Sequence, residues 1–304
     1  MSVMVSNRSA VLADRPAMAG TLPLLALPAV VFLFLLILLP AAAVLLIALT
    51  NWQFGAPAIR FVGLANFDAM WFDATFRASI LNTAIYTVTV VPATLLLGLL
   101  IALLIESGRS FRAFYRAVHF LPVMATLSAM AVAWEALLHP MIGLVNQVLR
   151  SAGLPAENWL NDPKLALATL CVVGVWQHSG YAMVLFMAGL KNIPTEIYDA
   201  AAVDGADAPL DRFFTVTLPL LGPMTMFVVI IISLRAFETF DTVQILTQGG
   251  PGTSSELLLH TLYTESFVYL RTGYGAALTT VFLAIVVTLT LIQARVLDRR
   301  VHYS

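Results

Sequence analysis

The stretch "EIYDAAAVDGADAPLDRFFTVTLPLL" (196–221) interrupts an otherwise apolar chain. It holds five acidic residues and one arginine around a patch of alanine and glycine, although 60% of the 304 residues are hydrophobic. Thr195 is the expected N-cap of a helix that begins at Glu196, and Gly205 is expected to end that helix in a left-handed conformation. Pro209 suits the first turn of a second short helix. The stretch therefore predicts two short helices joined at a glycine.

The rest of the chain has the composition of a membrane protein. Only 11% of its residues are charged and its mean hydropathy is +0.90, whereas soluble domains carry about a quarter charged residues. A bilayer core needs about 20 apolar residues in a helix. Six runs qualify: Thr21–Thr50, Ala78–Ile105, Ala117–Trp134, Leu165–Leu190, Phe213–Leu234 and Thr272–Gln293. These runs predict an all-α integral membrane protein with six transmembrane helices.

Basic residues in the connections predict the orientation. The first run is about twice as long as the apolar part of a signal peptide, so it is expected to stay as a helix. With the N-terminus inside, ten basic residues fall on the cytoplasmic side and five outside. Because Lys and Arg accumulate in cytoplasmic connections, both termini and the stretch after Glu196 are predicted to be cytoplasmic.

A surface with almost no side-chain bulk lies in the middle of the opening stretch. It is formed by Ala200, Ala201, Ala202 and Gly205. Another protein could approach the backbone closely there. A connector lying on the membrane surface explains the same pattern, and the residues alone leave both interpretations open.

The loop resembles the EAA motif of permease subunits of binding-protein-dependent ABC importers. The matching positions are Asp199, Ala200, Ala201, Gly205, Val216, Leu218 and Pro219. Aspartate replaces the usual glutamate, and the spacer after Gly205 is one residue longer. Five other stretches are similar, in order, to the larger maltose-type permease subunit: "FVGLANF", "FRAFYRAVHFLPV", "GLVNQVL", "WLNDPKLALATLCVVGVW" and "LTQGGPG". Together the matches cover about residues 20–296.

The resemblance implies a type I ABC importer transmembrane fold and a division of the chain. Residues 1–20 would be a cytoplasmic tail, 21–50 a peripheral first helix, 51–77 an outside loop, 78–296 the transmembrane core and 297–304 a second cytoplasmic tail. Residues 196–214 would be the coupling loop that docks into a groove of a cytoplasmic ATPase. The implied coupling residues are Glu196, Asp199, Ala200, Ala201, Asp204, Gly205, Leu218 and Pro219.

The resemblance also implies partners and a location. They are a second permease subunit in a heterodimer, two ATPase subunits that bind ATP and Mg²⁺, an extracytoplasmic substrate-binding protein, and the lipid of a bacterial inner membrane. The chain itself has no Gly-Lys pair and hence no P-loop. Its five histidines are scattered without i, i+4 pairing or neighbouring ligands. We therefore expect no catalysis, cofactor or metal in this chain, and a net charge of −1 gives no sign of nucleic acid.

Polar side chains at membrane depth mark the candidate substrate site, because burying them is costly. Two clusters supply them. The fourth run holds Trp176, Gln177, His178, Ser179 and Tyr181, of which Gln177 and Tyr181 are the candidate contacts, and the end of the fifth holds Arg235, Phe237, Glu238, Thr239 and Asp241. Hydrogen bonding between helices could explain the first cluster, and the outer boundary of a helix could explain the second. By similarity to the maltose-type subunit, both would line a central cavity, although the family's asparagines are absent.

The chemistry of the second cluster leaves two substrate classes open. A neutral saccharide or polyol is favoured, with aromatic rings and polar groups as its contacts. If Arg235 pairs with Glu238 three residues later, it only neutralises that carboxylate. If it points into the cavity, it could bind a phosphate, sulfonate or carboxylate. An ion-coupled secondary transporter is the alternative function, although no clear internal repeat supports it.

Overall fold

The structure of this protein, a computed structural model, describes residues 22–108, 110–206 and 208–300. Over these residues it contains helices and no β-strand, apart from an isolated antiparallel bridge between Thr50 and Phe61. The predicted all-α fold is therefore confirmed. In chain order, with short π-helical turns named η, the elements are α1 (Leu22–Leu33), η1 (Phe34–Leu38), α2 (Leu39–Ile47), α3 (Ala65–Phe72), α4 (Ala74–Ser107), α5 (Arg112–Met124), α6 (Leu127–Leu137), α7 (Leu144–Ser151), α8 (Ala166–Lys191), α9 (Thr195–Val203), α10 (Pro209–Arg212), η2 (Phe213–Thr217), α11 (Leu218–Leu220), α12 (Gly222–Phe237), α13 (Asp241–Leu246), α14 (Leu258–Tyr263), η3 (Thr264–Val268) and α15 (Thr272–Arg300).

Four helical stretches are long and apolar enough to cross a membrane by themselves. They are Ala26–Ile47, Ala74–Ser107, Ala166–Lys191 and Thr272–Val296, which correspond to the first, second, fourth and sixth predicted spans. The other two predicted spans are bent pairs of helices, so the described residues give six spans when each pair counts as one.

The prediction of the third span as one continuous helix from Ala117 to Trp134 is wrong. α5 ends at Met124, α6 begins at Leu127, and the two helices are bent by 103°. Ala125 and Thr126 between them are extended, with ψ of 146° and 138°. Two extended residues interrupt the helical hydrogen bonds while the sequence stays apolar, so the hydropathy pattern does not reveal the break.

The prediction of the fifth span as one continuous helix from Phe213 to Leu234 is also wrong. Its first eight residues continue the helical stretch that starts at Pro209, and a 66° bend at Leu221 separates them from α12. Pro223 follows the bend and has no amide hydrogen with which to bond back across it. The part of the span inside the bundle therefore begins near Gly222.

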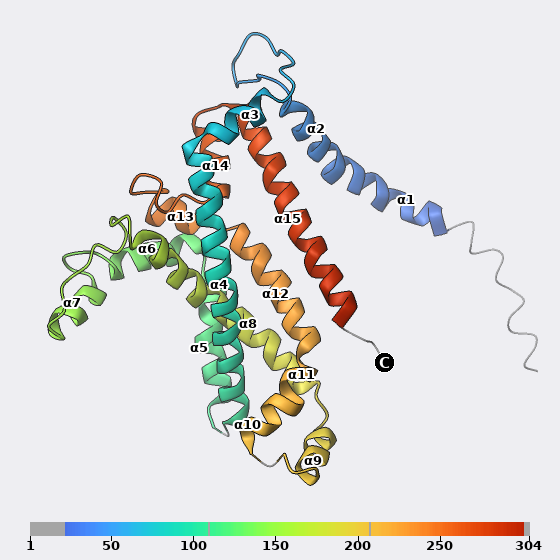
Figure 1. The fold of residues 1–304 in the computed structure, drawn as a ribbon, viewed down its shortest axis with the longest axis vertical. Coiled ribbons are helices and arrows are strands. Elements are labelled where there is room, and N and C mark those ends of the chain that lie inside the picture. Colours follow the sequence, from blue (N-terminus) through green and yellow to red (C-terminus); the bar gives the residue numbers. More distant parts are fainter. Residues whose placement is uncertain (1–21, 109, 207, 301–304) are drawn as a thin grey trace, which may run out of the picture.

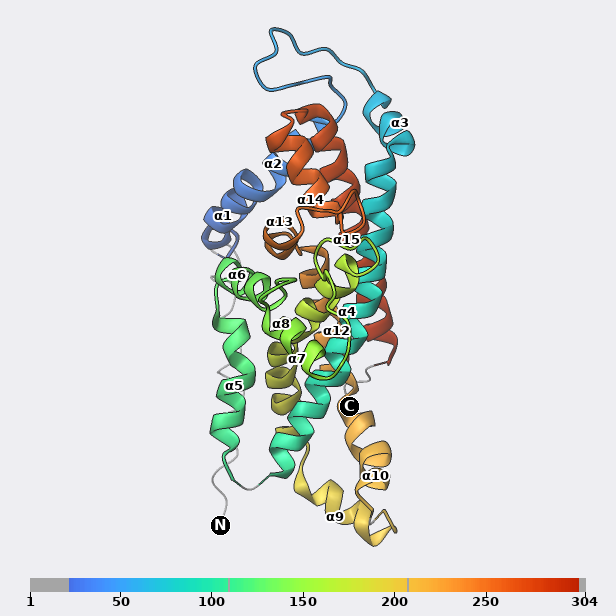
Figure 2. The same cartoon turned by 90° about the vertical axis from the view of Figure 1, so that its left-hand side faces the viewer.

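The long helices pack side by side along the long axis of the molecule (Figures 1 and 2). α4 packs along α8, and α12 packs against both. The side chains at their contact are fully buried and include Tyr86 and Val90 of α4, Met183 and Phe186 of α8, and Ile232 of α12. At one end of this bundle lie α9 and α10, and at the other lie α3 and α14 (Figure 1).

The first helical stretch lies outside the bundle. α1 runs away from the other helices in Figure 1, and only α2 packs against α15. None of the residues in its most apolar window is buried within the chain, and a peripheral place for this helix in an importer stays a prediction. The predicted N-terminal tail, 1–20, lies outside the described residues. The predicted C-terminal tail begins as helix, because α15 continues to Arg300, and its last four residues are likewise not described.

Candidate functional site

The predicted coupling segment forms two short helices at one end of the bundle (Figures 1 and 2). α9 begins at Thr195, so the predicted N-cap is wrong: Pro194 holds that position and no side chain caps the helix. Gly205 has φ of +97° and follows the end of α9, as predicted. The amide of Ala206 donates to the carbonyl oxygen of Ala201 at 2.8 Å, which is the hydrogen bond of a Schellman helix end. Pro209 starts α10, also as predicted.

One face of α9 is exposed and the other is packed against the bundle. The exposed predicted coupling residues here are Glu196, Asp199, Ala200, Asp204 and Gly205. Ala201 is half-buried and packs with Tyr198 on a small apolar cluster of Ile193, Val216 and Leu221. The hydroxyl groups of Tyr198 and Thr217 are 3.1 Å apart. Leu218 and Pro219 are exposed on α11. α9 is thus fixed to the stretch that leads into α12.

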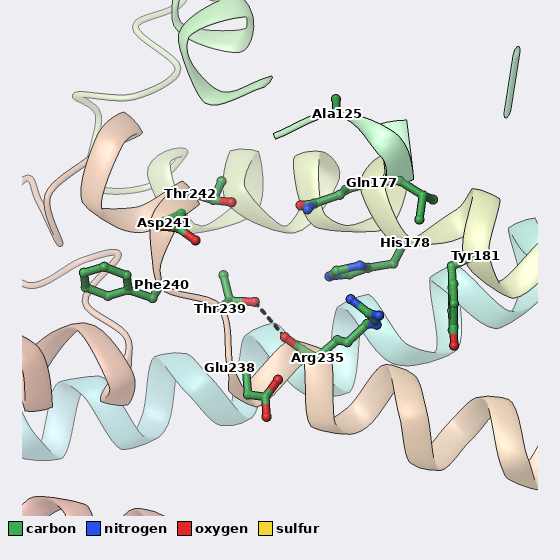
Figure 3. Close-up of a pocket in the computed structure, with 11 residues that line it drawn as sticks. Ala125, Gln177, His178, Tyr181, Arg235, Glu238, Thr239, Phe240, Asp241 and Thr242 are labelled. Carbon is green, nitrogen blue, oxygen red and sulfur yellow. Dashed lines mark hydrogen bonds between the residues drawn. The ribbon is translucent and has the colours of Figure 1, made fainter. Parts of the chain in front are cut away.

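A second site is a partly open cavity of about 220 Å³, at which Arg235 and Glu238 are exposed (Figure 3). It lies between the end of α5, the middle of α8, and the segment that joins α12 to α13. The residues that line it are Val123, Ala125, Gln177, His178, Tyr181, Arg235, Glu238, Thr239, Phe240, Asp241 and Thr242.

Six of the seven residues proposed for the substrate site line this cavity. They are Gln177, Tyr181, Arg235, Glu238, Thr239 and Asp241; Phe237 is not among the lining residues. α12 ends at Phe237, so the helical spacing no longer applies after it. Phe240 borders the cavity, but its ring is directed away from the other lining residues in Figure 3. His178 belongs to the predicted polar cluster of α8, whereas Thr242, which directly follows Asp241, was not predicted.

Arg235 contacts an aromatic ring and not its neighbouring carboxylate. Its Cζ atom lies 4.8 Å from the centroid of the Tyr181 ring, a distance at which a cation and an aromatic face attract each other. Figure 3 shows Arg235 directed toward Tyr181 and His178, while Glu238 points to the other side. The part of the chain that the structure describes holds no ion pair between Arg235 and Glu238. The geometry matches the second alternative, in which the arginine faces the cavity.

Thr239 ties the cavity to the core of the bundle. Its hydroxyl donates to the carbonyl oxygen of Arg235 at 3.2 Å and lies 3.4 Å from the hydroxyl of Tyr86, which is fully buried in α4. The cavity is therefore bordered by the guanidinium of Arg235, the amide of Gln177, the imidazole of His178, the ring of Tyr181 and the carboxylate of Asp241, whereas the carboxylate of Glu238 and the ring of Phe240 point away from Arg235 (Figure 3). Such a set can bind a hydroxyl-rich molecule with a charged group. Over the described residues, no three His, Cys, Asp or Glu side chains gather as a metal site would require.

Comparison with known proteins assigns the family. The profile of the family described as "Binding-protein-dependent transport system inner membrane component" matches residues 69–303. The probable ABC transporter permease protein YurN of Bacillus subtilis (strain 168) is 34% identical, over 88% of this chain and 92% of its own. The sulfoquinovosyl glycerol transport system permease protein SmoG of Agrobacterium fabrum is also 34% identical, over 90% and 89%. UgpA of Yersinia enterocolitica, an sn-glycerol-3-phosphate transport system permease protein, is 33% identical, over 93% and 94%.

The fold has a close counterpart among solved structures. A chain from a bacterial ABC transporter involved in the import of the acidic polysaccharide alginate superposes with a TM-score of 0.80. The two chains are 20% identical, and the superposition covers 93% of this chain and 96% of the other. The match shows the type I ABC importer transmembrane fold. The chain belongs to the family of binding-protein-dependent transport system inner membrane components, and it is an inner-membrane permease of the ABC importer class and not an enzyme.

Proposed function

We propose that this chain is one of two different permease subunits in an ATP-driven importer. The importer would take a sugar or polyol derivative from an extracytoplasmic binding protein and move it through the cavity of Figure 3 by alternating access. Two ATPase subunits would bind ATP and Mg²⁺, and this chain would bind neither. The proposal is supported by the family and by the names of relatives that cover most of the chain.

The cavity supports a substrate that carries an anionic group. The position of Arg235 carries this proposal, because its side chain lines the cavity with Cζ 4.8 Å from the centroid of the Tyr181 ring, and no carboxylate is paired with it in the described structure. A guanidinium can bind the oxygens of a phosphate, sulfonate or carboxylate in pairs. Two relatives are named for sulfoquinovosyl glycerol and sn-glycerol-3-phosphate transport. A neutral saccharide or polyol is the second candidate, supported by Glu238 and Asp241, whose carboxylates accept hydrogen bonds from hydroxyl groups.

The contacts of α9 support a route from the ATPase to the cavity. We propose that the exposed acidic and small residues of α9 dock into a partner ATPase. Tyr198 and Ala201 pack on Val216 and Leu221, so a displaced α9 would move the stretch that continues into α12. Arg235 lies in the last turn of α12. Movement at one end of α12 would therefore alter the cavity at the other.

The defining experiment is copurification from the membrane followed by reconstitution. A tagged chain is expected to retain two ATPase subunits and a second permease, and the reconstituted complex is expected to accumulate substrate only with ATP, Mg²⁺ and the binding protein. The binding protein is purified separately to identify the substrate that it retains. Uptake that follows an ion gradient without any ATPase would instead establish the secondary transporter.

The proposed topology gives a separate prediction. In a Cys171→Ser background, a cysteine at the exposed position 204 should react with a membrane-impermeant thiol reagent only after cells are permeabilised. A matched cysteine at the exposed position 58, in the predicted outside loop, should react in intact spheroplasts. Labelling of position 204 from outside would show that the predicted orientation is reversed. Protection of both positions from outside would place the 51–77 loop on the cytoplasmic side.

A further inference from the structure

A buried carboxylate lies beneath the loop that carries the "QGGPG" sequence. Glu256 is 7% exposed. Gly249 has φ of +80°, and a Cβ atom built on it would lie 1.7 Å from Oε2 of Glu256. Only glycine therefore fits above the carboxylate. From α4, the side-chain amide of Asn82 donates to the carbonyl oxygens of Thr253 and Glu256 at 2.8 and 3.0 Å, which fixes this loop to the bundle.

The carboxylate of Glu256 is held by two side chains of α14. Its Oε1 atom lies 2.7 Å from Nδ1 of His260 and 2.8 Å from Oγ1 of Thr261. Since a carboxylate oxygen accepts hydrogen bonds, both groups donate to it. His260 is 5% exposed. The sequence had not suggested a partner for this histidine, although Glu256 precedes it by four residues.

The other side of the His260 ring contacts the segment that forms the cavity wall. Nε2 lies 3.0 Å from Oε1 of Gln244 in α13, and the ring stacks on Phe240 with 6.1 Å between centroids and 29° between planes. Phe240 also contacts Tyr263, with centroids 4.7 Å apart. The backbone N–H of Gln244 donates to the carbonyl oxygen of Phe240 at 2.9 Å. His260 thus bonds the carboxylate of Glu256 through one edge of its ring. Its other edge contacts Gln244 of α13, and its face contacts the ring of Phe240.

We infer that His260 is a positioning residue for the cavity. It does not line the cavity, and it acts by holding Phe240 and the start of α13, where Asp241 and Thr242 line the cavity. A buried network of this kind keeps one arrangement, because leaving any polar member unpaired is costly. The inference rests on the proposed function of the cavity, and it predicts that removing the imidazole loosens the cavity wall while α4 and α8 keep their packing.

A reporter on the wall tests the inference directly. Thr242 is 4% exposed, so a cysteine at position 242, in a Cys171→Ser background of the full importer complex, should react slowly with a small thiol reagent. His260→Ala should raise that rate roughly tenfold and reduce ATP-driven uptake by a similar factor. Gln244→Ala removes the contact between α13 and His260 but leaves Glu256 bonded to His260. It should also raise the labelling rate.

Two further variants separate positioning from general loosening around Glu256. His260→Gln should restore a slow rate, because its amide can replace Nε2 in the contact with Gln244. Thr261→Val removes the other hydrogen bond to Glu256 and should leave the reporter slow, since the Thr261 hydroxyl bonds Glu256 and Leu257 and no residue of α13 among those described. An unchanged rate in both His260→Ala and Gln244→Ala overturns the inference, as does an equal rise in Thr261→Val. Absence of ATP-driven uptake in the complex with native His260 would instead refute the proposed function, while the reporter rates would still measure the position of the wall.

Discussion

Replacing Arg235 with glutamine should nearly abolish import of an anionic substrate while the complex still assembles. The side chain faces the cavity and stacks on Tyr181, so it is available to a phosphate or sulfonate. A hydrogen bond to a charged group contributes about 1.5–3 kcal/mol, and every 1.4 kcal/mol or so is tenfold, which predicts a loss of roughly 10- to 100-fold in the uptake rate. The measurement is initial uptake of the substrate retained by the binding protein, with basal ATPase activity recorded in the same vesicles.

Matched variants distinguish the two substrate classes. Arg235→Lys keeps the charge but loses the planar guanidinium and its paired donors, so it should recover only part of the uptake. Glu238→Gln should have little effect if the substrate is an anion, because the carboxylate points away from Arg235 in Figure 3. Loss of uptake in Glu238→Gln alone would favour a neutral polyol. Normal uptake in both Arg235→Gln and Glu238→Gln would remove this segment from the substrate site.

The sequence predicts the helices whose apolar runs are uninterrupted, and it misses the bends. α4 and α8 appear where expected because each is a continuous apolar run long enough to cross the bilayer. The break at Ala125 and Thr126 consists of two residues with extended backbone. Both are small and compatible with a helical run, so composition alone does not separate one span from two helices at 103°.

The cavity was predictable where polar side chains occur on helices that were themselves predicted. Gln177 and Tyr181 share a face of α8, and Arg235 lies on α12. Phe240 was missed because α12 ends at Phe237 and the chain changes direction before α13 begins. The contact of His260 with Gln244 joins residues 16 apart across two helices. No local pattern encodes such a contact, since it depends on how α13 and α14 pack.

Replacing Gly205 with valine should uncouple transport from ATP hydrolysis. Gly205 has φ of +97°, a conformation that costs other residues about 1–3 kcal/mol and a β-branched residue more than most. Among the described residues, no atom lies within 4 Å of a Cβ built on Gly205, so we expect the effect to come from the backbone and from the exposed face of α9. We expect uptake and substrate-stimulated ATPase activity to fall at least tenfold, with normal amounts of the chain in the membrane.

Gly205→Asn separates the two causes, because asparagine tolerates positive φ better than other side chains while adding similar bulk. If the left-handed turn alone matters, Gly205→Asn should retain most of the uptake that Gly205→Val loses. If a partner approaches the backbone closely, both variants should fail, and less ATPase should copurify with each. α9 packs on Val216 and Leu221 through Tyr198 and Ala201, on the side away from the exposed residues, so insertion and the core should be unaffected. Full uptake and full ATPase stimulation in both variants would show that this helix end does not couple the permease to its ATPase.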